Sequence, residues 1–146
     1  MQKQAKVLLL LTTAGFILLT GFKRDNLTSS SKASSPGKGP VTIIAVYDFS
    51  TFPDVLGTFT ASGAINASGT TEMVVSGNKN GVVAHCIVTL TAPNGTITIH
   101  QRCEFSTDPP KGQWNVISGT GAYANLKANG SLLMPPNTEA MEGTVY

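Results

Sequence analysis

The sequence contains few of the residues from which metal and redox sites are usually built. Its 146 residues include two cysteines and two histidines, and only 12% of them are Asp, Glu, Lys or Arg. It has no Cys-x-x-Cys pair, and the two histidines lack a clear third ligand, so we predict no metal site and no cofactor. Beyond residue 40, no segment repeats apolar residues at 3.6-residue spacing over more than two turns, which excludes a helical domain there.

Positive charge is scarce beyond residue 40. Residues 41–146 contain four Lys or Arg and seven Asp or Glu, a net charge of −3, whereas the whole chain has a formal charge of +2. The basic excess therefore belongs to the first 40 residues. A nucleic-acid-binding surface on the remaining chain has no support from charge.

The long uncharged run of the sequence lies near its N-terminus. Lys3 and Lys6 precede 16 uncharged residues, Val7 to Phe22, an order typical of an export signal. Because this run is shorter than the roughly 17 to 25 residues of a comfortable bilayer span, we predict a cleaved signal peptide over residues 1–33. Phe22 stands where a lipoprotein signal would carry its cysteine, which excludes lipidation there. The protein is thus expected to be secreted, periplasmic or at the cell surface, with membrane contact only through this segment.

The sequence after the signal predicts a short tether and one domain. Residues 34–40 are Ser, Pro, Gly and Lys, which bury too little apolar surface to offset the entropy of ordering. The remaining residues, 41–146, suffice for one domain with one core. Nothing in the sequence specifies an oligomeric state.

The domain reads as a series of short β-strands. Stretches of alternating, β-branched residues are separated by clusters of Gly, Asn and Pro. The predicted strands are Val41 to Phe49, Gly57 to Asn66, Thr71 to Ser76, Val82 to Ala92, Thr96 to Ser106, Gln113 to Ser118, Gly130 to Met134 and Ala140 to Val145. Eight evenly spaced strands favour an all-β domain, either an antiparallel barrel or a sandwich.

The central hairpin is predicted from the dipeptide Asn94-Gly95, which is typical of a two-residue type I′ turn. Centring the turn there pairs Pro93 with Thr96 and, further out, Cys86 with Cys103. A close antiparallel pair has Cα atoms at ~4.5 Å, within the range of a disulfide. We therefore predict a structural disulfide, with ~3 kcal/mol of stabilisation and an oxidising compartment.

This register also divides the hairpin into two faces. One face is apolar and is expected to point into the core; it carries Ala84, Cys86, Val88, Leu90, Ala92, Ile97, Ile99, Gln101, Cys103 and Phe105. The other face pairs His85 with Glu104, Thr89 with His100, and Ile87 with Arg102. A histidine beside a carboxylate can act as an acid or base, and an arginine can hold an anionic group. His85, His100, Arg102 and Glu104 are thus the candidate ligand-binding residues, although an ordinary solvated sheet face would look the same.

A glycine-rich segment follows the only tryptophan, Trp114. It reads Gly119-Thr120-Gly121-Ala122-Tyr123-Ala124-Asn125-Leu126. A phosphate-binding loop would need a helix after the glycines, whereas the following residues read as a strand. We expect the glycines to form a tight bend, with Tyr123 and Leu126 plugging one end of the fold.

This segment, with Trp114 and the earlier Gly57-Thr58-Phe59-Thr60-Ala61-Ser62-Gly63-Ala64-Ile65, resembles a group of secreted bacterial proteins of unknown role. Their pattern is similar to that of the allene oxide cyclase and dirigent-like barrels, and the resemblance covers most of Gly57 to Met134. It implies an eight-stranded antiparallel barrel closed at one end by the glycine-rich turn. It assigns no catalytic residue.

Three functions agree with these features. The first is a secreted barrel that binds a small, mainly apolar ligand in its lumen. The second is an enzyme of the cyclase or isomerase kind, in which a polar group such as Glu104 assists. The third is a cell-surface interaction or structural protein. An open apolar lumen favours binding, an open lumen with a buried ionisable group favours an enzyme, and a filled lumen favours display.

Overall fold

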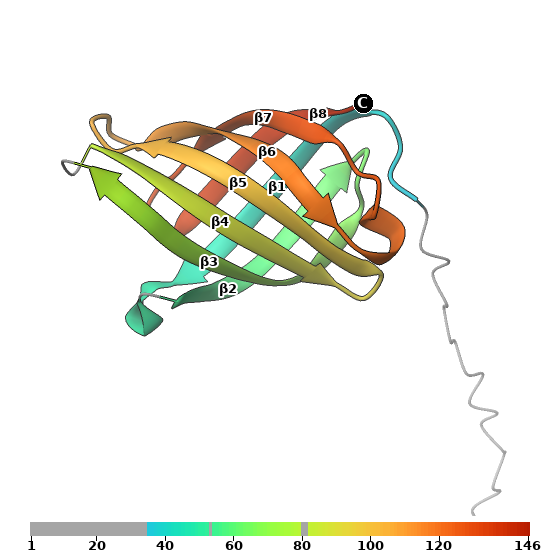
Figure 1. The fold of residues 1–146 in the computed structure, drawn as a ribbon, viewed down its shortest axis with the longest axis horizontal. Helices are drawn as coiled ribbons and strands as arrows, with labels where there is room; N and C mark the ends of the chain where they lie inside the picture. The colour runs from blue at the N-terminus through green and yellow to red at the C-terminus, as the bar shows by residue number, and fades with distance from the viewer. Residues whose placement is uncertain (1–34, 53, 80–81) are drawn as a thin grey trace, which may run out of the picture. The chain divides into compact units, whose positions relative to one another are not determined.

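The structure is a computed structural model that describes residues 35–52, 54–79 and 82–146. These residues form a single closed antiparallel barrel of eight strands, with two short 3-10 turns (Figure 1). The strands are β1 (Gly39–Asp48), β2 (Asp54–Gly63), β3 (Ala67–Lys79), β4 (Val83–Ala92), β5 (Gly95–Glu104), β6 (Lys111–Gly119), β7 (Ala128–Leu133) and β8 (Thr138–Val145). The predicted all-β barrel is confirmed, and each predicted strand overlaps one observed strand.

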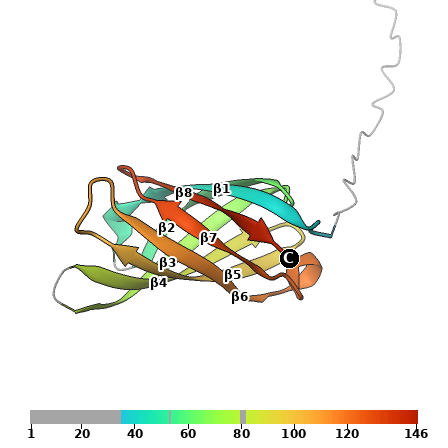
Figure 2. The same cartoon turned by 90° about the horizontal axis from the view of Figure 1, so that it is seen from above.

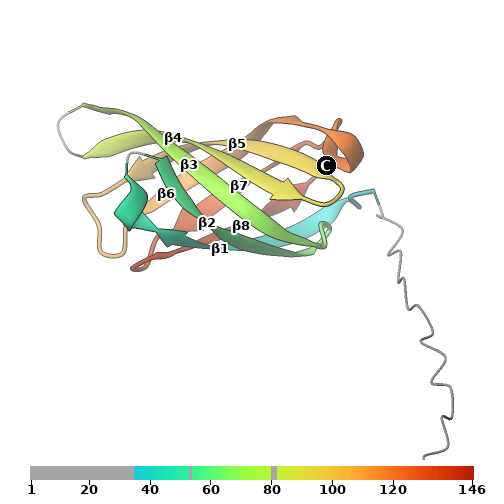
Figure 3. The same ribbon diagram turned by 90° about the horizontal axis from the view of Figure 1, so that it is seen from below.

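The sheet closes because β1 pairs with both β2 and β8. Every strand pairs with its neighbour in sequence, and the pairs Ile43↔Met141 and Ala45↔Glu139 join the first strand to the last. Seen from above, β7 and β8 lie in front (Figure 2), and seen from below, β3 and β4 do (Figure 3). Closure leaves the barrel without an unpaired edge between these strands.

The lumen is filled from alternate positions of each strand, as the pleat of a β-strand requires. The apolar face predicted for the central hairpin points inward, and Val88, Leu90 and Ile99 are completely buried. Phe105 is the exception, since it follows the end of β5 and is 42% exposed at the rim of the barrel. The predicted core face of the hairpin is otherwise confirmed.

The predicted register of this hairpin is wrong by two residues. The observed pairs are Ala92↔Gly95 next to the turn and, further out, Cys86↔Gln101 and Ala84↔Cys103. A shift of two residues keeps every side chain on its face of the sheet, so the predicted inward and outward faces are still correct. It replaces the predicted polar pairs by His85↔Arg102 and Ile87↔His100.

Proline explains the shift. In the predicted register, Pro93 would face Thr96 in a pair that exchanges two backbone hydrogen bonds, but proline has no N–H to donate. In the structure, Pro93 and Asn94 are the two turn residues, and proline is favoured at the first central position of a type I turn. Gly95 then begins β5 with a φ of +141°, a conformation suited to glycine.

The new register makes the two cysteines diagonal neighbours. Cys86 and Cys103 are both free, buried thiols, and the disulfide predicted between them is not formed. Diagonal positions lie roughly 7 to 8 Å apart, beyond the usual Cα separation in a disulfide. An oxidising compartment therefore has no support from a cysteine bond, and its prediction rests on the N-terminal signal alone.

The glycine-rich segment plugs one end of the barrel, as predicted. Its 3-10 turn η2 (Gly121–Tyr123) lies beside the β4–β5 turn (Figure 1), where the Ala122 N–H donates to the Asn94 carbonyl at 2.9 Å. Tyr123 is 3% exposed and packs in the core, and Leu126 is half-buried against it. The opposite end carries the other 3-10 turn, η1 (Phe49–Thr51), and we call that end the mouth.

The predicted signal peptide, residues 1–33, lies outside the described residues. Gly39 and Pro40, assigned by the sequence to the tether, are the first residues of β1. Just before them, the Gly37 N–H donates to the Ala64 carbonyl at 2.9 Å. The part of the tether next to the domain thus runs along the barrel.

Trp114 packs across two strand glycines. It pairs with Gly130 of β7, which pairs with Gly143 of β8. The indole N–H donates to the carbonyls of Ser131 at 3.0 Å and Glu142 at 3.3 Å. A Cβ at Gly143 would lie 2.2 Å from the Asn129 carbonyl oxygen and 2.5 Å from the indole ring. Glycine is therefore required for this close approach of strands and ring.

We expect Gly143→Ala to lower the free energy of unfolding by about 2 kcal/mol, because overpacking of a filled core costs about 1 to 3 kcal/mol. Urea denaturation followed by Trp114 fluorescence measures the change. Gly37→Ala is the matched control, since a Cβ there meets no atom nearer than 3.9 Å. Equal effects of the two substitutions would contradict this packing account.

Candidate functional site

A buried carboxyl group lies inside the barrel. Glu139 is completely buried, and the Tyr47 hydroxyl donates to its Oε2 at 2.8 Å. The Gln101 side-chain amide donates to its Oε1. Both carboxyl oxygens are thus hydrogen-bonded, as a buried polar group requires. We call Tyr47, Gln101 and Glu139 the lumen triad.

Closure of the barrel assembles the lumen triad. Glu139 occupies an inward position of β8 opposite Ala45, whose small side chain leaves room for the carboxyl group. Tyr47 follows two residues later on the same face of β1. Gln101 comes from β5, three strands from β8 around the barrel. The carboxyl group therefore joins strands on different sides of the lumen.

Burial changes the acidity of these groups. Loss of solvation raises the pKa of Glu139 to about 7, while the hydrogen bonds from Tyr47 and Gln101 oppose this rise. Burial, and then the charge of Glu139, raise the pKa of the Tyr47 phenol well above its usual value. The carboxyl group therefore exchanges its proton near neutral pH, whereas the phenol remains protonated and acts as the donor.

Thr71 adds a second polar group to the lumen. Its side chain is 2% exposed, and its hydroxyl interacts with the Tyr47 phenol, which partly opposes the rise in the pKa of Tyr47. The strand pairs Tyr47↔Gly57 and Gly57↔Thr71 place it in the same row as Tyr47, with only a glycine between. Thr71 therefore extends the row of buried polar groups that begins at Glu139 and Tyr47.

A cavity of about 270 Å³ opens at the mouth of the barrel. Met73 and Cys86 are buried in its wall, while Phe49 and Phe105 are partly exposed. Tyr47 belongs both to this wall and to the lumen triad, so Glu139 lies one hydrogen bond behind the cavity. The remaining lining residues are mainly apolar or proline: Val75, Pro110, Met134, Pro135, Pro136, Asn137 and Thr138.

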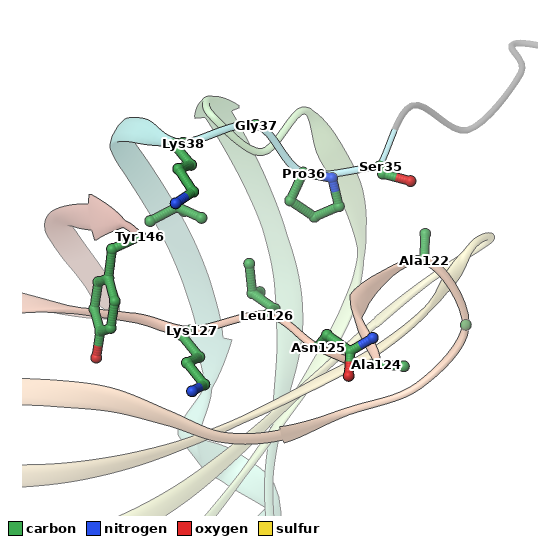
Figure 4. A pocket seen from close by; sticks show the side chains of 12 residues that line it. Ser35, Pro36, Gly37, Lys38, Ala122, Ala124, Asn125, Leu126, Lys127 and Tyr146 are labelled. Carbon is green, nitrogen blue, oxygen red and sulfur yellow. The ribbon is translucent and has the colours of Figure 1, made fainter.

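A second hollow, of about 370 Å³, lies at the plugged end. Figure 4 shows Pro36, Lys38, Leu126 and Lys127 around it, where the chain before β1 passes the segment after η2. Both lysines are exposed. No polar side chain that is buried without a partner lines this hollow in the described part of the chain. The mouth cavity, with its buried polar groups, is therefore the stronger candidate site.

The four predicted ligand-binding residues lie on the outside of the barrel. His85 and His100 stack with ring centroids 5.3 Å apart, and His85 Nδ1 lies 3.2 Å from His100 Nε2. Arg102 faces His85 across the hairpin, and Glu104 accepts a hydrogen bond from the Ser106 hydroxyl at 2.8 Å. The structure thus brings the histidines into contact but separates all four residues from the lumen by the thickness of the sheet.

The outer face of β5–β7 is hollowed beside these residues. Arg102 lines two adjacent hollows of about 440 and 560 Å³, and Gln113 and Ser131 also line both. His100 lines one of them and Glu104 the other. Arg102, Gln113 and Ser131 are exposed to solvent. These hollows suit a polar surface contact more than an apolar ligand.

The lumen triad is not among the site residues predicted from the sequence. Gln101 was placed on the inward face but was not considered as a site residue. Glu139 lies one residue before the predicted last strand. It is an even number of residues from Met141 and Val145, which are both buried, so it belongs to the same inward face. Extending that alternation by one step would have identified an inward carboxyl group. The contact with Tyr47 joins residues 92 positions apart, and no local pattern indicates it.

Comparisons with family models, with curated proteins and with solved structures find no match to this chain. The resemblance to the allene oxide cyclase and dirigent-like barrels therefore stays a prediction. In the described part of the chain, no three or more His, Cys, Asp or Glu side chains lie together where they could hold a metal ion. No helix among the described residues has the length and apolar character needed to cross a membrane.

Because of Glu139, the free energy of unfolding should decrease as the pH rises from about 4.5 to about 7. Between the unfolded pKa of 4.5 and the folded pKa of about 7, the folded chain keeps a proton that the unfolded chain has lost. The contribution of the Glu139 proton to the free energy of unfolding is therefore largest below pH 4.5. It is lost by about pH 7, which is a difference of about 3 kcal/mol. Urea denaturation across this range should show the loss in the wild type, but not in Glu139→Gln.

Glu142→Gln is the matched control for this prediction. Glu142 lies three residues further along β8 and is exposed on the outer face. Its neutralisation should leave the pH dependence of the wild type unchanged. If Glu139→Gln also retained that dependence, the burial of the Glu139 carboxyl would not control it.

Proposed function

We propose that this protein binds a small, mainly apolar molecule in the mouth of the barrel. The observation that carries the proposal is the cavity of about 270 Å³ with its largely apolar wall. Ligand pockets usually measure roughly 300 to 1,000 Å³. A cavity slightly smaller than this range suits a molecule of one or two rings, or a short hydrocarbon chain.

The wall of the cavity is fixed before a ligand arrives. Tyr47 is held by its hydrogen bond to Glu139, which is held in turn by Gln101. Met73 and Cys86 are fully buried within the sheet. A preformed wall lowers the entropy that binding must overcome. The more exposed Phe49 and Phe105 at the rim provide apolar surface that can cover the ligand.

The cavity also helps to distinguish ligand binding from the third predicted function, a cell-surface interaction or structural protein. A completely filled lumen would favour a structural or display role, and most of this lumen is filled by side chains of the core. The mouth is the part that stays open, and its wall is apolar. This favours binding over display. Export by the predicted signal peptide, outside the described residues, belongs to this proposal as the route to the extracellular side.

The proposal is tested by titrating the full chain with 1-aminonaphthalene, a two-ring dye that is uncharged at neutral pH and whose fluorescence shifts to shorter wavelength in apolar surroundings. The wild type should bind it saturably at one site. Val75→Phe should weaken binding at least tenfold, because Val75 is half-buried in the cavity wall and a phenyl ring would occupy the space.

Val116→Phe is the matched control. Val116 is also a half-buried valine packed against the core, but it lies beside a hollow at the plugged end. This variant should bind the dye like the wild type, and so should His100→Ala on the outer face. Absence of saturable binding to the wild type, or equal losses in both valine variants, would overturn the proposal.

The second candidate is an enzyme of the cyclase or isomerase kind. The observation that favours it is the buried Glu139 carboxyl, one hydrogen bond behind the cavity wall. A positioned carboxyl group with a tyrosine donor can move a proton on a bound molecule. This role belongs to Glu139, not to Glu104, which lies on the outer face.

The two candidates are separated by incubating an apolar extract of the host with the wild type and with Glu139→Gln. An isomerase or cyclase would replace one compound by another of equal mass but different chromatographic retention, and the variant would not. A compound that is retained unchanged by both proteins would indicate binding alone.

A further inference from the structure

The sulfur-containing side chains of the described residues gather in the mouth half of the lumen. Met73, Cys86, Cys103 and Met141 are at most 1% exposed, and Met134 is half-buried. Met73, Cys86 and Met134 line the mouth cavity. The plugged half is filled by other apolar side chains, among them Val41, Ile65, Ala92, Tyr123 and Ala128.

Three of these sulfur atoms come from consecutive strands. Cys86 of β4 faces Val75 of β3, and Met73 lies two residues from Val75 on the same inward face. On the other side, Cys86 faces Gln101 of β5, and Cys103 lies two residues beyond it. Met73 and Cys103 are therefore diagonal neighbours of Cys86 on its two sides, close enough for side chains to meet.

The two thiols lie within hydrogen-bonding reach of each other. Their hydrogen bond, followed by burial, raises the pKa of the Cys103 thiol well above its usual value. Cys103 also lies 3.9 Å from the Gln101 side-chain oxygen. The diagonal register separates the backbones too far for a relaxed disulfide. A metal ion, with metal–sulfur bonds of about 2.3 Å, can join two sulfur atoms that are not bonded to each other.

The donor set selects the kind of ion. Thiolate and thioether sulfur favour soft ions such as Cu(I), whereas Ca²⁺ and Mg²⁺ require oxygen ligands. The nearby carboxyl oxygens of Glu139 already accept hydrogen bonds from Tyr47 and Gln101. The histidines lie on the outer face of the sheet. A zinc site would lack the four ligands it usually has.

We propose that Cys86, Cys103 and Met73 form a binding site for one soft monovalent metal ion, Cu(I). Both thiols lose their protons when the ion binds, so the two thiolates and one Cu(I) carry a net charge of −1. The ion reaches the site through the mouth cavity, whose wall includes Met73 and Cys86. This site does not depend on an organic ligand in the cavity, and it departs from the expectation that the sequence provides no metal site.

The test is a competition between the full chain and bicinchoninate for Cu(I), under anaerobic reducing conditions. The wild type should withdraw one Cu(I) per chain from the coloured complex. Cys86→Ser and Cys103→Ser should each lower the affinity at least 100-fold, since each removes a thiolate. Met73→Leu should lower it about tenfold.

Met141→Leu is the matched control, because Met141 is as buried as Met73 but contacts Gln101. It should bind Cu(I) like the wild type, as should His85→Ala. Exchange of methionine for leucine conserves volume, so both methionine variants should fold. Equal effects of Met73→Leu and Met141→Leu would overturn the assignment of ligands.

Two measurements on the wild type test the metal site even if a cysteine variant fails to fold. X-ray absorption of the Cu(I)-loaded protein should show three sulfur neighbours; nitrogen neighbours would move the ion to the outer histidines and overturn the proposal. Alkylation of the exported protein, denatured without reductant, should modify two thiols per chain. Modification of neither would reveal a disulfide, which leaves no thiolates for the ion and also overturns the proposal.

Discussion

The pairing of β1 with β8 is the constraint on which the rest of the structure depends. It turns an eight-stranded meander into a closed barrel, so that inward side chains of all strands share one lumen. Closure also fixes how much volume each row of side chains can occupy. Large rings such as Trp114 fit only where neighbouring strands carry glycine, as at Gly130 and Gly143. The packing of the barrel therefore depends on large and small residues that are complementary although they lie far apart in the sequence.

Closure explains why the interior has two halves of different character. At the plugged end, η2 and Tyr123 complete an apolar core. Toward the mouth, the same lumen receives the carboxyl group of Glu139, the amide of Gln101 and the thiols of Cys86 and Cys103. A buried carboxyl group is stable there because both of its oxygens are hydrogen-bonded. The polar groups and the opening thus occur together, which is why the mouth is the functional candidate.

The two cysteines show which features of the hairpin a local sequence pattern can predict and which it cannot. The alternation around Asn94-Gly95 predicted the correct faces, because a slip of two residues returns each side chain to its original side. The exact partner of Cys86 depended on the turn, where Pro93 has no N–H to give to the predicted pair. An error of two residues in the register does not change which side chains form the core. It does decide whether the two cysteines face each other, as a disulfide needs, or remain free thiols.

The sequence by itself determined the all-β class, the eight strands, the inward face of the central hairpin and the plugging role of the glycine-rich turn, because these follow from local alternation and turn chemistry. It placed its candidate site on the outer face, where His85 and His100 are neighbours across one hairpin. The lumen triad was decided by tertiary structure alone. Tyr47, Gln101 and Glu139 lie on three strands that meet only when the sheet closes, and no pattern within one hairpin specifies that closure.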